Sequence, residues 1–359
     1  MRTLTLLAAV AISFVATAPA PAMAQTTAPA PADASALPLR AYIPTTISPQ
    51  AAAMYRAYRA FVLAPRPPIN RTAAEFDAAY KVSEKHNIEA SEARLKLYPG
   101  TAITQRLING VTVYDVRPKD YRDDGTVIIN VHGGGYVGGS AKSDLGGVAT
   151  AAAVTGKRFI SVEYTVAPHG RWQLVTDQVL AVYKGVLAEG TRADHIGMTG
   201  GSAGGDIVAA TTLKIRDQGL PMPAALVLIS PMTDFTEGGD TRQTLKDADP
   251  ALRADEVRPA LDAYADPADQ KNPYVSPVYG DFTKGYPPTL IQGGTKEWLL
   301  SDMVRLNRRI KEAGGVSDLE IYEGMPHGFP GLFINAPEGK EAMAEQIAFW
   351  NRYLPTAKR

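Results

Sequence analysis

A serine set among glycines is the residue of this sequence best suited to covalent chemistry. Residues 196–205 read IGMTGGSAGG and contain the pattern G-x-S-x-G centred on Ser202. A short strand pattern precedes it and an apolar helical pattern follows, so we expect a tight strand-to-helix turn that presents the hydroxyl as a nucleophile. Gly200 and Gly204 leave room where a Cβ would clash. The pattern alone is weak among 32 glycines, and a glycine-rich turn that only packs is an alternative. A dinucleotide-binding loop is disfavoured, because the ordered G-x-G-x-x-G and the ribose-binding acid are not convincing here.

Three successive glycines follow another strand pattern, in the run VHGGGY at residues 131–136. Backbone amides in such a turn can point into a cavity, where an acyl-transfer enzyme needs donors for the oxyanion of its tetrahedral intermediate. We predict the amides of Gly134, Gly135 and Ala203 as these donors, Ala203 being the residue after the nucleophile. We interpret His132 as a ring that holds the glycine loop by hydrogen bonds and takes no part in proton transfer.

One histidine stands in the right part of the chain to act as the general base. His327 lies in the run MPHGF, directly after the last predicted strand. In the fold that uses G-x-S-x-G, the triad members follow the order serine, acid, histidine. His86, His132, His169 and His195 all precede Ser202, so they fit the role less well.

The acid of a triad should lie between Ser202 and His327, after the penultimate strand. Glu297 and Asp302 both qualify, in the run GGTKEWLLSD at residues 293–302. We favour Glu297 because it stands in the loop leaving that strand, where active-site groups of α/β sheets gather. Asp302 has another explanation, since it follows Ser301, a candidate N-cap, in the first turn of a helix.

The elements that must position these residues alternate between strands and helices. Apolar runs predict seven strands, at residues 111–116, 126–131, 158–164, 196–199, 225–230, 289–292 and 319–322. Apolar stripes between them predict helices, and this alternation indicates an α/β fold with a largely parallel sheet. Residues 48–96 are helical in pattern, with Pro49 and Thr72 at helix starts. We expect residues 39–98 to form a helical cap on the catalytic domain at 99–359.

Composition excludes several other classes of protein. Lys+Arg and Asp+Glu both number 37, so the formal net charge is +0 and gives no footprint for nucleic acid. The absence of cysteine removes disulfides, thiolate nucleophiles and cysteine-bound zinc. The five histidines form no metal-binding motif. We therefore expect no metal, no cofactor, no nucleic-acid partner and no stable membrane anchor.

The N-terminal residues have the features of a secretory signal peptide. Arg2 supplies a positive charge, residues 4–16 are apolar, and Ala22 and Ala24 flank a small-residue cleavage site. Cleavage near Ala24 predicts a periplasmic or secreted protein, and an uncleaved membrane anchor is the alternative. Residues 25–38 are rich in alanine, proline and threonine, so we expect a disordered linker.

Taken together, the motifs resemble the hormone-sensitive-lipase-like family of α/β-hydrolases. They follow one another as HGGGY, GGSAGG, PPTLIQGGTKEWLLSD and EGMPHGF, from about Ile108 to the C-terminus. The resemblance implies an α/β-hydrolase fold, with a mostly parallel eight-stranded sheet, helices on both faces and an N-terminal helical cap. It implies the triad Ser202, Glu297 and His327, and hydrolysis of small carboxylic esters of short to medium acyl chains.

The chain departs from this family's pattern at several positions. The family often has Asp before the nucleophile and Asn four residues after it, where this chain has Gly201 and Asp206. The stretch YTVAPHGRW at 164–172 also differs, and the acid is more often Asp than Glu. Two alternatives to an esterase stay open: a non-catalytic small-molecule binding protein on this fold, and an amidase or acyltransferase that uses the same triad.

Overall fold

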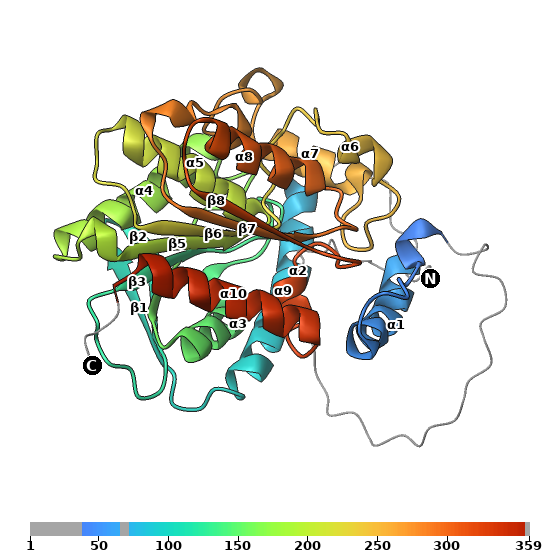
Figure 1. Cartoon of the computed structure of the whole chain (residues 1–359), viewed down its shortest axis with the longest axis horizontal. Helices are drawn as coiled ribbons and strands as arrows, with labels where there is room; N and C mark the ends of the chain where they lie inside the picture. The colour runs from blue at the N-terminus through green and yellow to red at the C-terminus, as the bar shows by residue number, and fades with distance from the viewer. Residues whose placement is uncertain (1–37, 65–71, 356–359) are drawn as a thin grey trace.

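The computed structural model describes residues 38–64 and 72–355, and these form a sheet covered by helices on both faces (Figure 1). The predicted signal peptide and most of the predicted linker lie outside the described residues. None of the described helices combines the length and apolar character that a membrane crossing requires.

Eight strands form one sheet in the order β1-β2-β4-β3-β5-β6-β7-β8. The strands β1 and β2 pair antiparallel, as do β2 and β4, and every later neighbour pairs parallel. The predicted eight-stranded, mostly parallel sheet is therefore confirmed. The strands are β1 (Ala102–Ile108), β2 (Val111–Arg117), β3 (Val127–Val131), β4 (Arg158–Val162), β5 (Ile196–Gly201), β6 (Ala225–Ile229), β7 (Thr289–Gly294) and β8 (Ser317–Tyr322).

Helices cover the two faces of the sheet and bury two separate cores. On one face, α4 (Trp172–Ala188), α5 (Ala203–Asp217) and α8 (Leu300–Glu312) enclose the larger core. On the other face, α3 (Ala141–Thr155) and α10 (Pro337–Tyr353) enclose the smaller one. Neighbouring residues of β3 point to opposite cores, Ile128 to the smaller and Ile129 to the larger, as alternation along a strand requires.

The two predicted N-terminal helices are present and begin where the sequence predicts. They are α1 (Pro49–Leu63) and α2 (Ala73–Leu95). The Thr72 side chain accepts a hydrogen bond from the Glu75 amide, and the Glu75 carboxylate accepts one from the Thr72 amide. This reciprocal capping box fixes the start of α2. The division into cap and catalytic domain at residue 98 stays a prediction.

Between β6 and β7 the chain forms a long irregular excursion that the sequence patterns did not predict. It holds the helices α6 (Thr241–Thr244) and α7 (Ala254–Tyr264). The last short helix, α9 (Phe329–Leu332), follows β8 and leads into α10. The predicted helix start at Ser301 is wrong, because α8 begins at Leu300 and the Ser301 amide instead donates to Thr241 Oγ1, at 2.9 Å.

Candidate active site

The turn at Ser202 has the tight geometry that the sequence predicts. Ser202 joins β5 to α5 with a φ of 55° and a ψ of −123°, a strained conformation for a residue with a side chain. A Cβ on Gly200 would lie 2.4 Å from the carbonyl carbon of Gly204, and one on Gly204 would lie 2.1 Å from the Val131 oxygen. Side chains are therefore excluded at both positions. Gly201 is different, because its Cβ would meet nothing nearer than 3.8 Å.

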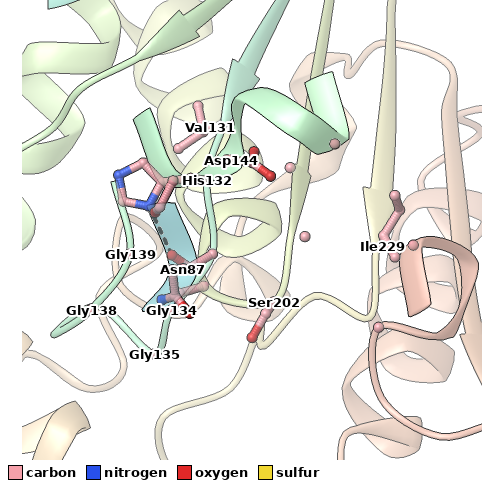
Figure 2. A pocket seen from close by; sticks show the side chains of 18 of the residues that line it. Asn87, Val131, His132, Gly134, Gly135, Gly138, Gly139, Asp144, Ser202 and Ile229 are labelled. Carbon is pink, nitrogen blue, oxygen red and sulfur yellow. Dashed lines mark hydrogen bonds between the residues drawn. The ribbon is translucent and has the colours of Figure 1, made fainter. Parts of the chain in front are cut away.

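The glycine loop after β3 lies next to Ser202 (Figure 2). Gly134 and Gly135 both have positive φ values, 116° and 61°. The Gly138 amide donates to the Gly134 oxygen, at 3.0 Å, so the loop turns back on itself. A Cβ on Gly134 would lie 2.1 Å from the Gly138 oxygen, which excludes any other residue there. Ala203, the third predicted donor, lines the same cavity.

His132 is buried beside this loop and bonds to neighbouring residues of the fold. Its Nδ1 lies 2.8 Å from the Gly133 oxygen, and its ring stacks on Tyr164 with centroids 4.1 Å apart. The Tyr164 hydroxyl donates to the His132 oxygen, at 3.0 Å. Burial lowers the pKa of His132 to about 4, so the ring is neutral near pH 7. These contacts suit a ring that holds the glycine loop.

His327 and Glu297 contact each other in the buried interior. The Nδ1 of His327 lies 3.1 Å from Glu297 Oε2, and the two side chains are 2% and 0% exposed. The other oxygen, Glu297 Oε1, accepts from Ser230 Oγ at 2.8 Å and from the Gly294 amide at 2.7 Å. His327 lines the cavity that Ser202 also lines. The structure thus brings the three predicted triad residues to one place.

The long glutamate side chain fits because the strand end beneath it is glycine. A Cβ on Gly293 would lie 2.8 Å from Glu297 Oε1, so the carboxylate folds back over that position. A Cβ on Gly294 would lie 1.9 Å from the Met325 oxygen, in the loop that carries His327. The two glycines therefore let both loops approach closely enough for Glu297 to reach the imidazole.

Asp302, the alternative acid, is held in a separate ion pair. Its Oδ1 lies 3.0 Å from Arg242 Nε and its Oδ2 lies 2.6 Å from Arg242 Nη2, with both side chains fully buried. The amides of Thr233 and Asp234 also donate to Asp302 Oδ2, at 2.9 and 3.0 Å. These partners occupy both oxygens of Asp302, while His327 bonds to Glu297.

A second unusual carboxyl group lies just beyond the nucleophile. Asp206 is fully buried in the first turn of α5, and its Oδ2 accepts from the Tyr136 hydroxyl at 3.0 Å. No cation pairs with it among the described residues. Burial, with Asp302 nearby, raises the pKa of Asp206 well above its usual range. This shift favours the protonated carboxyl group, which has the same shape as the asparagine that the family often has at this position.

The altered stretch at 164–172 joins the N-terminal helices and the excursion after β6 to the catalytic domain. His169 Nε2 lies 2.7 Å from Asp77 Oδ1 on α2. Trp172 Nε1 donates to Asp269 Oδ2, at 2.8 Å, in the excursion. The side chains of His169 and Trp172 therefore bond to other parts of the fold, while Tyr164, at the start of the stretch, contacts His132.

A cavity of about 360 Å³ contains Ser202 at its base. Its walls come from the glycine loop, α2, α9 and the segment around α7, and include apolar groups such as Phe76, Leu252, Val257 and Leu332. The contribution of the segment around α7 does not follow from the sequence, because this segment contains no recognisable motif. Within residues 38–64 and 72–355, no group of three or more acidic or histidine side chains is placed to hold a metal ion.

Two further buried residues beside the site, Ser230 and Asp249, were not predicted from the sequence. Ser230 stands at the end of β6 and bonds to both loops, because its hydroxyl donates to Glu297 Oε1 and accepts from the Gly328 amide, at 2.9 Å. Its position beside the penultimate strand was a usable signal, since carboxyl ends of parallel strands share one edge. Asp249 accepts from the Trp298 amide, at 2.9 Å, and comes from an irregular loop with no such signal.

Comparison with known proteins decides the family. Residues 128–331 match the family model described as having an alpha/beta hydrolase fold. An acetyl-hydrolase of Streptomyces hygroscopicus is 30% identical over 251 residues, which are 70% of this chain and 82% of that protein. The chain belongs to the α/β-hydrolase family.

Solved structures of esterases are similar to this structure over nearly the whole described chain. An esterase from the bacterial hormone-sensitive lipase family has a TM-score of 0.76 at 29% identity, and covers 86% of this chain and 99% of its own. A second esterase reaches a TM-score of 0.79 at 28% identity, over 87% of this chain and 96% of its own. The predicted family resemblance and the predicted class of carboxylic ester hydrolase are confirmed.

Proposed function

We propose that this hydrolase cleaves carboxylic esters of short to medium acyl chains through an acyl-enzyme on Ser202. The observation that carries the proposal is the contact between Glu297 and His327 Nδ1 beside a strained serine, in one cavity. A hydrogen bond at Nδ1 leaves Nε2 of His327 free to accept the serine proton, as a general base requires.

The reaction follows from these groups. Ser202 Oγ attacks the ester carbonyl carbon while its proton passes to His327 Nε2. The oxyanion that forms accepts hydrogen bonds from the amides of Gly134, Gly135 and Ala203. The protonated imidazole, stabilised by Glu297, gives its proton to the leaving alcohol, and the C–O bond breaks. Water then attacks the acyl-enzyme by the same route and releases the carboxylic acid.

The size and lining of the cavity support a small ester as substrate. A volume of about 360 Å³ lies at the lower end of the range of about 300–1,000 Å³ for small-molecule pockets. Apolar side chains of α2 and of the segment around α7 line the cavity, so an acyl chain that binds there is removed from water. A series of p-nitrophenyl esters from acetate to palmitate, with the matched anilide of the best acyl group, tests this. Activity confined to palmitate, or to the anilide, would contradict the proposal.

Replacement of the nucleophile tests the whole mechanism. Ser202→Ala should lower kcat on the best ester by on the order of 10⁵–10⁶-fold, because the covalent route is lost. A fluorophosphonate probe should label the wild type at Ser202, located by peptide mass spectrometry, and leave the variant unlabelled. Thr199→Ser, in the same strand, is the matched control and should keep both labelling and activity. An alanine variant with wild-type turnover would refute the triad.

We further propose that the protein is secreted or periplasmic after cleavage near Ala24. The support is the pattern of residues 1–24, namely a positive charge, an apolar run and a small-residue cleavage site. N-terminal sequencing of the protein recovered outside the cytoplasm should begin at Gln25. Recovery of the full chain from the cytoplasm alone would contradict it.

A further inference from the structure

The loop that carries Glu297 also carries a buried lysine that faces the N-terminal arm, here defined as residues 38–48. The Lys296 side chain is 8% exposed, and its Nζ donates to the Tyr42 oxygen at 2.6 Å. The same Nζ lies 5.6 Å from the centroid of the Tyr42 ring and 5.1 Å from that of Tyr55, which is on α1. Lys296 thus places a cation between two aromatic rings of the N-terminal segment.

The arm and α1 also contact the loop that carries His327. The Tyr55 hydroxyl donates to the Gly324 oxygen at 2.5 Å. A Cβ on Gly324 would lie 2.6 Å from the Ile47 side chain, so the arm rests directly on this turn. The amide and hydroxyl of Ser48 donate to the Glu338 carboxylate, at 2.6 and 2.8 Å. The arm is therefore anchored at its end as well as over the loop.

The two loops bond to each other beneath this arm. The Lys296 amide donates to the Met325 oxygen at 3.2 Å, and the Gly324 amide donates to Thr295 Oγ1 at 2.7 Å. Met325 packs with Tyr55 and Phe329 in a small apolar cluster that joins α1 to α9. The arm and α1 thus cover one side of the two loops that carry Glu297 and His327. These two side chains meet on the other side of the loops.

Burial and a nearby carboxylate act on the Lys296 cation in opposite directions. Burial lowers the pKa of Lys296 to about 8, while the buried Asp249 carboxylate opposes this shift. Asp249 in turn accepts from the amide of Trp298, the residue after Glu297. The segment 296–298 is therefore bound on one side by the arm and on the other by Asp249.

We propose that Lys296 is a positioning residue through which the N-terminal arm and α1 hold Glu297 against His327. The role of this contact in ester hydrolysis rests on the proposed function, whereas its geometry does not. If the arm holds the loops in register, its loss should lower the rate of proton transfer and leave substrate binding, which occurs in the cavity at Ser202, nearly unchanged.

Kinetics of three variants test the proposal. Lys296→Met keeps the stem and removes the cation, and should lower kcat about 10- to 100-fold with KM within about twofold. Lys296→Arg should recover at least a fifth of the wild-type kcat, because a guanidinium can still donate to Tyr42. Tyr55→Phe keeps the ring and loses the bond to Gly324, and should lower kcat about 3- to 10-fold. Lys284→Met is the control, because that side chain is 66% exposed and pairs with its surface neighbour Asp281, and its kcat should match the wild type.

Two readouts separate positioning from mere loss of folding. Turnover is divided by the fraction of enzyme that a fluorophosphonate labels, so unfolded molecules do not count. Proton NMR follows the downfield Nδ1–H resonance of His327, identified by its absence in His327→Ala, and needs no substrate. The signal should shift or broaden in Lys296→Met and stay in place in Lys284→Met. An unchanged signal with kcat within twofold of wild type would overturn the proposal, whereas an inactive wild type with the expected NMR change would refute only the esterase function.

Discussion

Four buried carboxyl groups lie in and around the active site, and their partners differ. Glu297 bonds to an imidazole, a hydroxyl and an amide, while Asp302 bonds to a guanidinium. Asp206 accepts a hydrogen bond from a tyrosine hydroxyl, and Asp249 accepts hydrogen bonds from three backbone amides. Because a buried charge requires a cation or several donors, these partners set which group is ionised and which can act in catalysis.

Replacing each carboxylate by the corresponding amide should separate the roles of the two candidate acids, Glu297 and Asp302. Glu297→Gln should lower kcat on the order of 10³–10⁴-fold with a small change in stability, because the imidazole loses the carboxylate that fixes its tautomer. Asp302→Asn should leave turnover per labelled site unchanged and lower the free energy of unfolding by about 3–5 kcal/mol, because Arg242 loses its buried partner. Urea unfolding and active-site-normalised kinetics measure both. The reverse pattern would assign the triad acid to Asp302.

The raised pKa of Asp206 predicts an unusual dependence of stability on pH. A carboxyl group whose pKa is raised in the folded state stabilises the fold below its unfolded pKa, and this contribution is lost as pH rises. Asp206→Asn removes the titration and keeps the shape. The variant should therefore match or exceed the wild type in Tm at pH 8, with the difference shrinking as pH falls toward 4. Thermal unfolding across this pH range is the measurement, and a larger difference at pH 4 than at pH 8 would contradict the assignment.

At the scale of elements, the N-terminal helices are docked by close backbone contact. Gly146 on α3 faces α2, where its amide donates to Ser91 Oγ at 2.8 Å. A Cβ on Gly146 would lie 2.8 Å from the Ser91 oxygen and 2.9 Å from Arg94 Cβ. The arginine continues this contact, because its Nη2 donates to the Gly331 oxygen on α9, at 3.2 Å. The helix α2 is thus joined both to α3 and to the segment after His327.

A pair of neighbouring glycines tests this docking. Gly146→Ala should destabilise the protein by about 1–3 kcal/mol, because the added methyl group pushes α2 away from α3. Gly147→Ala is the matched control, since a Cβ there would meet only Asp144 Oδ1, at 3.1 Å, and alanine favours the helix. Its stability should stay within about 1 kcal/mol of the wild type. Equal effects in the two variants, measured by urea unfolding, would refute the close contact.

The elements differ in how well their sequences predict them. The apolar strands β3, β5, β6 and β7 and the glycine turn at Ser202 have strong local signals, so their positions follow from pattern alone. The strand β1 was missed because it lies at the sheet edge and is mostly exposed. The contacts of Lys296 and Asp249 join residues far apart in sequence, and no local pattern encodes such contacts.

At the scale of the whole molecule, one sheet separates two cores of different size. The smaller core includes Phe349 and Trp350 of α10, and Trp350 is 3% exposed and packs with residues of β3, β6 and β7. A Cβ on Gly197 would lie 2.7 Å from the indole ring, so the helix packs directly on β5. No other tryptophan belongs to this core among the described residues.

Removal of the Trp350 indole should show how much the smaller core contributes to the free energy of unfolding. Trp350→Ala should lower the free energy of unfolding by about 3–5 kcal/mol, because it leaves a large cavity between α10 and the sheet. Arg352→Ala, two residues along the same helix with a 61% exposed side chain, should change it by at most about 1 kcal/mol. Denaturant titration of both variants is the check. A loss below about 1 kcal/mol for the tryptophan variant would mean that the smaller core contributes little.

The contacts of the N-terminal arm also have a consequence for the order of folding. Ser48 bonds to Glu338 across 290 positions, and Tyr55 bonds to Gly324 across 269. A growing chain makes the arm first and its binding surface last, and such distant contacts form slowly because a long loop must close. A ribosome-bound chain that stops before β8 therefore lacks His327, and it also lacks Gly324 and Glu338, to which the N-terminal residues bond. The enzyme should acquire activity only after synthesis of the chain is nearly complete.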